Sequence, residues 1–204
     1  MSSSSEKIAA RVPQRERGRR RVESLIRAAV ALFAEKGYDA VTMTEVAARA
    51  GAPIGSLYQF FPSKEALADA VLERIGSLLE DALIGIEARV RTITVAELVE
   101  ALLGVLVGFE QERAAATTLI ESRQEASARA AELKLSRRRR IARILRARIP
   151  KLPAKRAEVM AAVVIQLMKA AAGQRAESEP GIRDNVLREL KGLMELYINE
   201  KMGG

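Results

Sequence analysis

Residues 42–64 read TMTEVAARAGAPIGSLYQFFPSK, and this stretch decides the fold. It predicts two short helices joined by a tight turn. Thr42 and Glu45 have the spacing of a capping box, in which each side chain hydrogen-bonds the other residue's backbone. Gly51 supplies the left-handed position at which a helix commonly ends, and Pro53 favours the first turn of the next helix. The stretch therefore predicts a helix-turn-helix, whose second helix can enter a major groove.

A longer helix is predicted just before this stretch, at residues 22–36. Its apolar residues recur at the three- and four-residue spacing of one helix face, and Gly37 is its natural stop. We expect Phe33, Val46 and Leu57 to share the core of a three-helix head, which Phe61 joins. The head is followed directly by a fourth helix that Ser63 can cap.

Several of these residues also carry a family likeness. They are Gly37, Tyr38, Thr42, Val46, Ala47, Ala50, Gly51, Gly55, Ser56, Leu57, Tyr58, Phe61, Ser63, Lys64, Glu65 and Leu67. Their order and spacing resemble the N-terminal domain of TetR-family transcriptional regulators. The resemblance implies a DNA-binding head, a C-terminal body that varies with its ligand, and a two-fold dimer.

The composition of the 204 residues points to an all-α fold. Apolar residues make up 49% and aromatic residues 3%, and alanine and leucine dominate. The chain has no cysteine and no histidine, which excludes disulfides, the commonest metal ligand and the commonest general base. We therefore expect no enzyme, no cofactor and no metal site, and we interpret the acidic residues near 110–125 as solvated helix faces.

The formal net charge of +8 favours polyanions such as nucleic acid, although solubility or attraction to a membrane surface would also explain it. The N-terminus lacks the apolar segment of a signal peptide. The most apolar stretch, residues 101–109, is far shorter than the ~20 residues of a membrane span. We expect a cytoplasmic protein without membrane contacts.

Three regions follow in order: a disordered basic arm at 1–18, a helix-turn-helix domain at 19–64, and a ligand-binding and dimerisation domain at 65–204. The arginines of the arm region can reach a minor groove or phosphates, or they can form a solubilising tail; they are Arg15, Arg17, Arg19, Arg20 and Arg21. The fourth helix continues one apolar stripe from the head into the body, so a tilt of this helix would carry the head.

The body is predicted to contain helices at 95–113, 114–123, 128–149, 154–175 and 181–202. Gly104 and Gly108 either allow close helix approach or mark a bend or a cavity wall. Arginines 137–140 resemble a nucleic-acid patch, but the apolar face around them favours a solvated helix face. The last two helices, which carry Val164 and Leu190, are either ordinary core or half of a dimeric four-helix bundle; the resemblance implies the dimer.

DNA contacts are expected from the second helix of the motif and its flanks. Gln59 can pair with adenine and Ile54 can touch a thymine methyl group, while Lys64 begins a helix that favours an anion. The hydroxyl of Tyr58 can reach a phosphate, unless that ring packs inside the head. The full predicted set is Thr42, Thr44, Ile54, Gly55, Ser56, Tyr58, Gln59 and Lys64. Because no Arg or Asn occupies a reading position, DNA shape is expected to contribute to specificity.

The effector site is expected in the body, because ligand sites are mostly apolar with a few placed polar groups. The predicted lining is Leu102, Leu106, Phe109, Ile120 and Met168, with Glu110, Gln111 and Gln124 as the nearest polar groups. Few aromatic residues are available for stacking, so an aliphatic or mixed hydrophobic ligand fits better.

Together these features predict a dimeric, ligand-responsive repressor that leaves its operator when a small hydrophobic effector binds. The alternatives are an activator or an architectural DNA-binding protein without an effector, and a basic helical enzyme. Loss of DNA binding on adding a compound separates the first reading from the second, and turnover of a compound would support the third.

Overall fold

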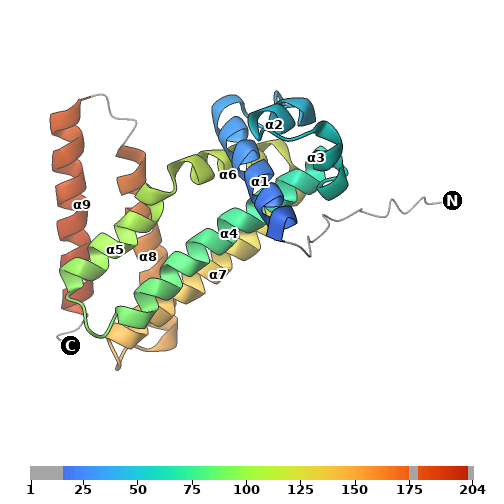
Figure 1. The fold of residues 1–204 in the computed structure, drawn as a ribbon. Coiled ribbons are helices and arrows are strands. Elements are labelled where there is room, and N and C mark those ends of the chain that lie inside the picture. The colour runs from blue at the N-terminus through green and yellow to red at the C-terminus, as the bar shows by residue number, and fades with distance from the viewer. Residues whose placement is uncertain (1–15, 175–178, 202–204) are drawn as a thin grey trace. The chain divides into compact units, whose positions relative to one another are not determined.

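Helices account for every regular element that the computed structural model describes, which confirms the predicted all-α fold (Figure 1). The described residues are 16–174 and 179–201, without the side chains at 124–130 and 180. The helices are α1 (Glu16–Lys36), α2 (Met43–Arg49), α3 (Ile54–Phe60), α4 (Lys64–Arg89), α5 (Val95–Gly108), α6 (Glu110–Ser122), α7 (Gln124–Arg148), α8 (Ala154–Gly173) and α9 (Pro180–Glu200).

The chain forms two compact units. The head unit contains the described residues up to Ser77 together with Gln111–Ala130, and the body unit contains Leu78–Glu110 and the described residues from Ala131 onward. The division falls inside α4, so this helix contributes its first half to the head unit and its second half to the body unit.

The core of the head unit is built from the predicted residues. Phe33, Val46, Leu57 and Phe61 are all buried, and α2 packs against both α1 and α3. Local signals fix the helix ends: Gly37 and Gly51 have φ values of +78° and +59°, a region open to glycine at little cost. Helices α1 and α2 therefore stop where the sequence predicts, and the turn between α2 and α3 is fixed.

The body unit has a separate apolar core. It is formed by residues such as Leu98, Leu102, Ile144, Met160 and Met168, all of which are buried. In this unit α8 and α9 pack on each other and both pack against α5 (Figure 1). The broadly apolar surface of α5 is thereby covered, as a helix with few polar faces requires.

Several helix boundaries differ from the prediction, including the start of α7 at Gln124 rather than at residue 128. Helix α1 begins at Glu16 rather than at residue 22, and Glu16 forms ion pairs with Arg19 and Arg20 one turn later. Helix α5 ends at Gly108 rather than near residue 113, and α6 begins at Glu110 after a break at Phe109. Of the three readings of Gly108, which were close helix approach, a bend and a cavity wall, the bend fits the end of α5 at this residue.

Candidate functional site

The turn between α2 and α3 is held by side chains of α1. The Arg21 Nη1 atom donates a hydrogen bond to the carbonyl oxygen of Gly51 at 3.2 Å, and the Ser24 hydroxyl donates one to that of Ala50, also at 3.2 Å. These bonds satisfy carbonyl groups that the end of α2 leaves without helical partners. Sequence reasoning missed this role for both residues, because their partners lie far away along the chain.

Helix α3 exposes one face and buries the other. Leu57 is fully buried and anchors the helix, whereas Ile54 and Tyr58 are 41% and 51% exposed. Gly55 and Gln59 are exposed as well. The side chain of Tyr58 is therefore available at the surface, so the alternative of packing inside the head is wrong. The exposed face of α3 carries four of the predicted DNA contacts, at positions that a groove-bound helix would use.

The remaining predicted contacts have different surroundings. The Thr42 hydroxyl is engaged in the capping box with Glu45, accepting from its backbone N–H at 3.2 Å, while Thr44 is exposed and Ser56 is half-buried. The Lys64 Nζ atom donates to the carbonyl oxygen of Asp39 at 3.1 Å and lies 4.4 Å from the centre of the Tyr38 ring.

Lys64 therefore ties the start of α4 to the segment between α1 and α2. Its ammonium group has three donors, and the contact with Asp39 uses one of them. The structure thus gives Lys64 a structural role in the head. Its contact with a DNA phosphate stays a prediction.

Exposed ion pairs connect α1 with α2 in the head. Arg49 makes a bidentate pair with Glu35, with distances of 3.1 and 2.6 Å, and Lys36 pairs with Glu45 at 2.8 Å. The hydrogen bonds from Lys36 and from the backbone and hydroxyl of Thr42 lower the pKa of Glu45 to about 2. The capping box at the start of α2 is therefore charged throughout the physiological pH range.

The basic arm is described only in part. Arg15 lies outside the described residues, whereas Arg17, Arg19, Arg20 and Arg21 lie on α1 rather than in an extended segment. Since Arg21 holds the turn before α3, the prediction that it belongs to a free arm is wrong. The others are presented by a helix.

Helix α6 belongs to the head unit and contacts it directly. The Thr118 hydroxyl donates to the carbonyl oxygen of Phe33 at 3.2 Å, near the end of α1. Arg123, which follows α6, pairs with Asp69 of α4 at 2.8 Å and lies over the Tyr38 ring. These contacts connect segments far apart in the sequence, and no local pattern predicts them.

The predicted effector residues are distributed over both units. Leu102, Leu106 and Met168 are buried in the body core, against which Phe109 packs, whereas Ile120 lies in the head unit. Two of the polar candidates, Glu110 and Gln111, are exposed; the side chain of Gln124 lies outside the described residues. The prediction that these residues line one effector site stays a prediction.

The body unit contains open cavities formed by described residues. One of about 370 Å³ lies between α7 and α8, and another of about 570 Å³ lies beside α5 near the ion pair of Lys191 with Glu100. A third, of about 430 Å³, lies beside α7 and includes Glu80 and Arg140. None of these three is lined by a predicted effector residue whose side chain the structure describes.

The arginine run at 137–140 is not a uniformly solvated face. Arg140 forms ion pairs with Glu80 and with Glu87 of α4, whereas Arg139 is exposed. Arg137 and Arg138 are half-buried and line the cavity between α7 and α8. The predicted solvated face is therefore correct only for Arg139.

Helices α8 and α9 also carry apolar side chains on the surface. Val159 and Val163 of α8 are exposed, as are Leu193 and Leu196 of α9. Val164, by contrast, is fully buried in the core of the body, because it lies on the opposite face of α8 from its neighbour. An interface through Val164 itself is therefore excluded, and the available apolar surface lies at the other positions.

The described residues also bear on two other classes of site, metal centres and membrane spans. Within the described residues there is no group of three or more acidic side chains that could hold a metal ion. Across the same part of the chain, no helix combines the length and apolarity needed to cross a membrane.

Comparisons with known proteins agree with this architecture. A family model for bacterial regulatory proteins of the tetR family matches residues 25–71, and a model for the C-terminal domain of tetracyclin repressor-like proteins matches residues 94–197. The second model alone covers more than half of the chain. No curated protein matches the sequence.

Solved structures share the fold at low sequence identity. A transcriptional regulator from Aquifex aeolicus VF5 has a TM-score of 0.67 and 22% identity over 85% of this chain and 99% of its own. A TetR-like transcriptional regulator from Rhodococcus sp. RHA1 has a TM-score of 0.63 and 20% identity, covering 95% and 100%. The transcriptional regulator FadR from Bacillus subtilis, solved with stearoyl-CoA, has a TM-score of 0.62 and 17% identity, covering 86% and 97%.

Proposed function

The chain belongs to the TetR family of DNA-binding transcriptional regulators, and we propose that it is a repressor released from its operator by a small-molecule effector. The exposed face of α3 is its proposed base-reading surface. Gln59 is suited to an adenine edge and Ile54 to a thymine methyl group, while Tyr58 and Lys64 are suited to phosphates.

The main support for the proposed effector response is that α4 continues without a break from the head unit into the body unit. Residues Lys64–Ser77 of this helix belong to the head and Leu78–Arg89 to the body, without a linker between them. A ligand that binds only one tilt of α4 in the body would shift the population of head positions. Moving that population from about 99% DNA-competent to about 99% released requires that the ligand prefer the released state by about 5.5 kcal/mol.

Contacts of α6 with α1 and α4 offer a second way in which a structural change could reach the head. Its Thr118 contacts the carbonyl group of Phe33, and Arg123 contacts Asp69 on the head part of α4. A displacement of α6 would therefore disturb α1 and α4 of the head together. Ala115 and Leu119 of α6 are fully buried as well, so a displacement of this helix would also change apolar packing.

A homodimer completes the proposed mechanism. The exposed residues Val159, Val163, Leu193 and Leu196 provide apolar surface on α8 and α9, where a second copy can form a four-helix bundle. Two heads then bind two half-sites about one helical turn of DNA apart, and an altered spacing weakens both contacts together.

The effector is proposed to have an apolar part. The body core is rich in aliphatic side chains, including Leu102, Leu106 and Met168. The FadR structure from Bacillus subtilis holds stearoyl-CoA, so a related fold can accommodate a long aliphatic molecule. This neighbour supports the ligand class only as an analogy, because fold does not determine function.

The test begins with selection of bound DNA from a random pool, which yields the operator. Binding of the selected duplex is then measured by fluorescence anisotropy at fixed salt, with and without candidate amphipathic compounds. We expect one compound class to weaken operator binding by about tenfold or more, within the range of allosteric couplings. Transcription from a promoter containing the operator should fall when protein is added. A rise would favour the activator, and operator binding unaffected by any compound would favour the architectural protein.

A further inference from the structure

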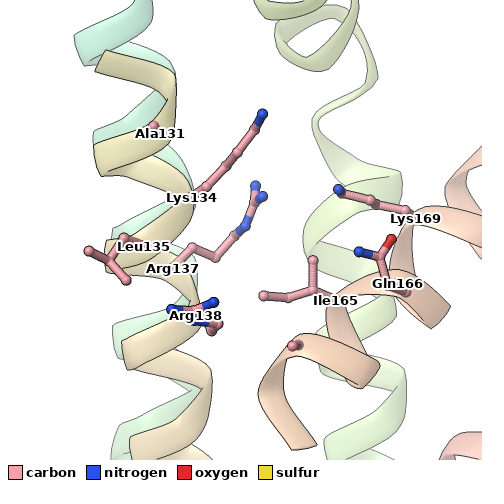
Figure 2. Close-up of a pocket in the computed structure, with 9 residues that line it drawn as sticks. Ala131, Lys134, Leu135, Arg137, Arg138, Ile165, Gln166 and Lys169 are labelled. Atoms are coloured by element: carbon pink, nitrogen blue, oxygen red, sulfur yellow. The ribbon is translucent and has the colours of Figure 1, made fainter. Parts of the chain in front are cut away.

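The cavity between α7 and α8 in the body unit has an unusual lining. Four cationic side chains surround it: Lys134, Arg137 and Arg138 from α7 and Lys169 from α8. Figure 2 shows Lys134, Arg137 and Lys169 directed toward the space between the two helices, with Ile165 near its base. Among the residues whose side chains the structure describes, no acidic one lines the cavity, so none of them balances the four positive charges there.

Two of these cations are incompletely satisfied. The Nε atoms of Arg137 and Arg138 are buried and have no hydrogen-bond partner in the described part of the chain. Burial lowers the pKa of Arg137, and no carboxylate opposes that effect. A buried polar group without a partner is destabilising, and in native proteins such groups commonly have a functional explanation.

The neighbouring arginines show that carboxylates are available nearby but do not serve this cavity. Arg140 pairs with Glu80 and Glu87 of α4, and Arg143 pairs with Glu87 at 3.3 Å. Both acidic residues are therefore engaged away from Arg137 and Arg138. The side of α7 that faces α8 keeps its positive charge.

Apart from the amide of Gln166, the rest of the lining is apolar. Ile165 is buried and belongs to the same core as Leu102, Leu106 and Met168, and Leu135 and two alanines complete the aliphatic part. A volume of about 370 Å³ is within the range of small-molecule sites. The cavity therefore combines a cationic rim with an aliphatic base.

We propose that this cavity binds a phosphate monoester with an aliphatic chain, whose phosphate lies among the four cations and whose chain lies against Ile165. A carboxylate has a single charge, whereas a phosphate monoester has close to two charges at neutral pH and three terminal oxygens. Arginine guanidinium groups bind such oxygens in pairs, and lysine adds point charges. The further claim that this phosphate monoester is the effector rests on the proposed function.

The test uses octyl phosphate as the probe and isothermal titration calorimetry on the full chain. Octanoate, octanol and inorganic phosphate are titrated in parallel to separate the contributions of the phosphate and of the chain. We expect octyl phosphate to bind more tightly than each of the other three. Equal binding of octanoate would overturn the assignment to phosphate, and absence of octyl phosphate binding would overturn the site.

Arg137→Met and Arg139→Gln form a matched pair, since both remove one positive charge from α7 but only Arg137 lines the cavity. Arg137→Met should weaken octyl phosphate binding by about tenfold or more, whereas Arg139→Gln should leave it nearly unchanged. Without ligand, Arg137→Met should melt at the same or a higher temperature, because it removes a half-buried charge whose buried Nε atom has no partner among the described residues. Equal weakening by both variants would indicate nonspecific charge attraction and overturn the proposal.

Operator binding is measured in the same solutions. Octyl phosphate binding without operator release would support the site and contradict the proposed regulatory response. Release of the operator by another compound, with no octyl phosphate binding, would overturn the site and leave the proposed function in place.

Discussion

Gly55→Ala separates the stability of α3 from its use in DNA binding. Gly55 is exposed in the first turn of α3, and a Cβ atom added there meets no other atom within 4 Å. Its φ angle is not in the left-handed region, so alanine fits without strain. Alanine also restricts the unfolded chain, so we expect the free energy of unfolding to rise by about 0.4–1 kcal/mol. For a chain of this size, the melting temperature should increase by roughly 1–4 °C.

The same methyl group should weaken operator binding. It projects from the helix whose exposed face carries Ile54, Tyr58 and Gln59, where the backbone must come close to the DNA. Holding α3 away from the groove by the thickness of a methyl group should remove at least one base contact. One such contact contributes about 1–3 kcal/mol, so affinity should fall by roughly 5- to 150-fold.

Gly85→Ala is the control, because Gly85 is exposed on α4 in the body unit and also has no atom within 4 Å of an added Cβ. Both variants are compared with the original chain by thermal melting and by fluorescence anisotropy on the selected operator at one salt concentration. Gly85→Ala should gain stability and keep its operator affinity. If Gly55→Ala binds the operator as tightly as Gly85→Ala, close approach of this part of α3 to DNA is refuted.

Three further outcomes are expected. Gln59→Ala should relax preference at one base pair, costing about 1–3 kcal/mol there, and an unchanged preference profile in a binding selection would argue against base reading by Gln59. Leu193→Glu should give monomers in light scattering and weak operator binding, whereas Ile84→Glu, at another exposed apolar position, should stay dimeric; a dimeric Leu193→Glu protein would exclude this interface. The pKa of Glu45 is lowered from 4.5 to about 2 in the folded chain, so its contribution to stability is present above pH 4.5 and is lost as the pH falls toward 2. Glu45→Gln should flatten that part of the curve of melting temperature against pH, and an unaltered curve would contradict this role.

The ends of the helices in the head could be predicted because their signals are local. The predicted capping box of Thr42 with Glu45 is present, and it depends on residues only three positions apart. The body unit has a capping box of the same kind, formed by Thr94 and Glu97. Gly51 ends its helix with a positive φ angle, as predicted. These interactions need no information about distant parts of the chain, so the sequence alone suffices.

Predictions that depended on distant partners were less successful. Val163 and Val164 are adjacent and chemically identical, yet the first is exposed and the second is buried. Choosing between them requires knowing on which side of α8 the other body helices pack. The roles of Arg21 and Thr118 were missed for the same reason, because the residues they contact are 30 and 85 positions away.

The four arginines at 137–140 show how the structure changes the meaning of a sequence pattern. Successive residues of an α-helix point about 100° apart, so a continuous run cannot form one face. Arg140 is neutralised by Glu80 and Glu87 of α4, whereas Arg137 and Arg138 face a cavity in which no described side chain is a carboxylate. The same residue type therefore ties α7 to α4 on one side and leaves positive charge on the other. Since only the second group has unsatisfied buried donors, it is this half of the run, and not the run as a whole, that points to an anionic ligand.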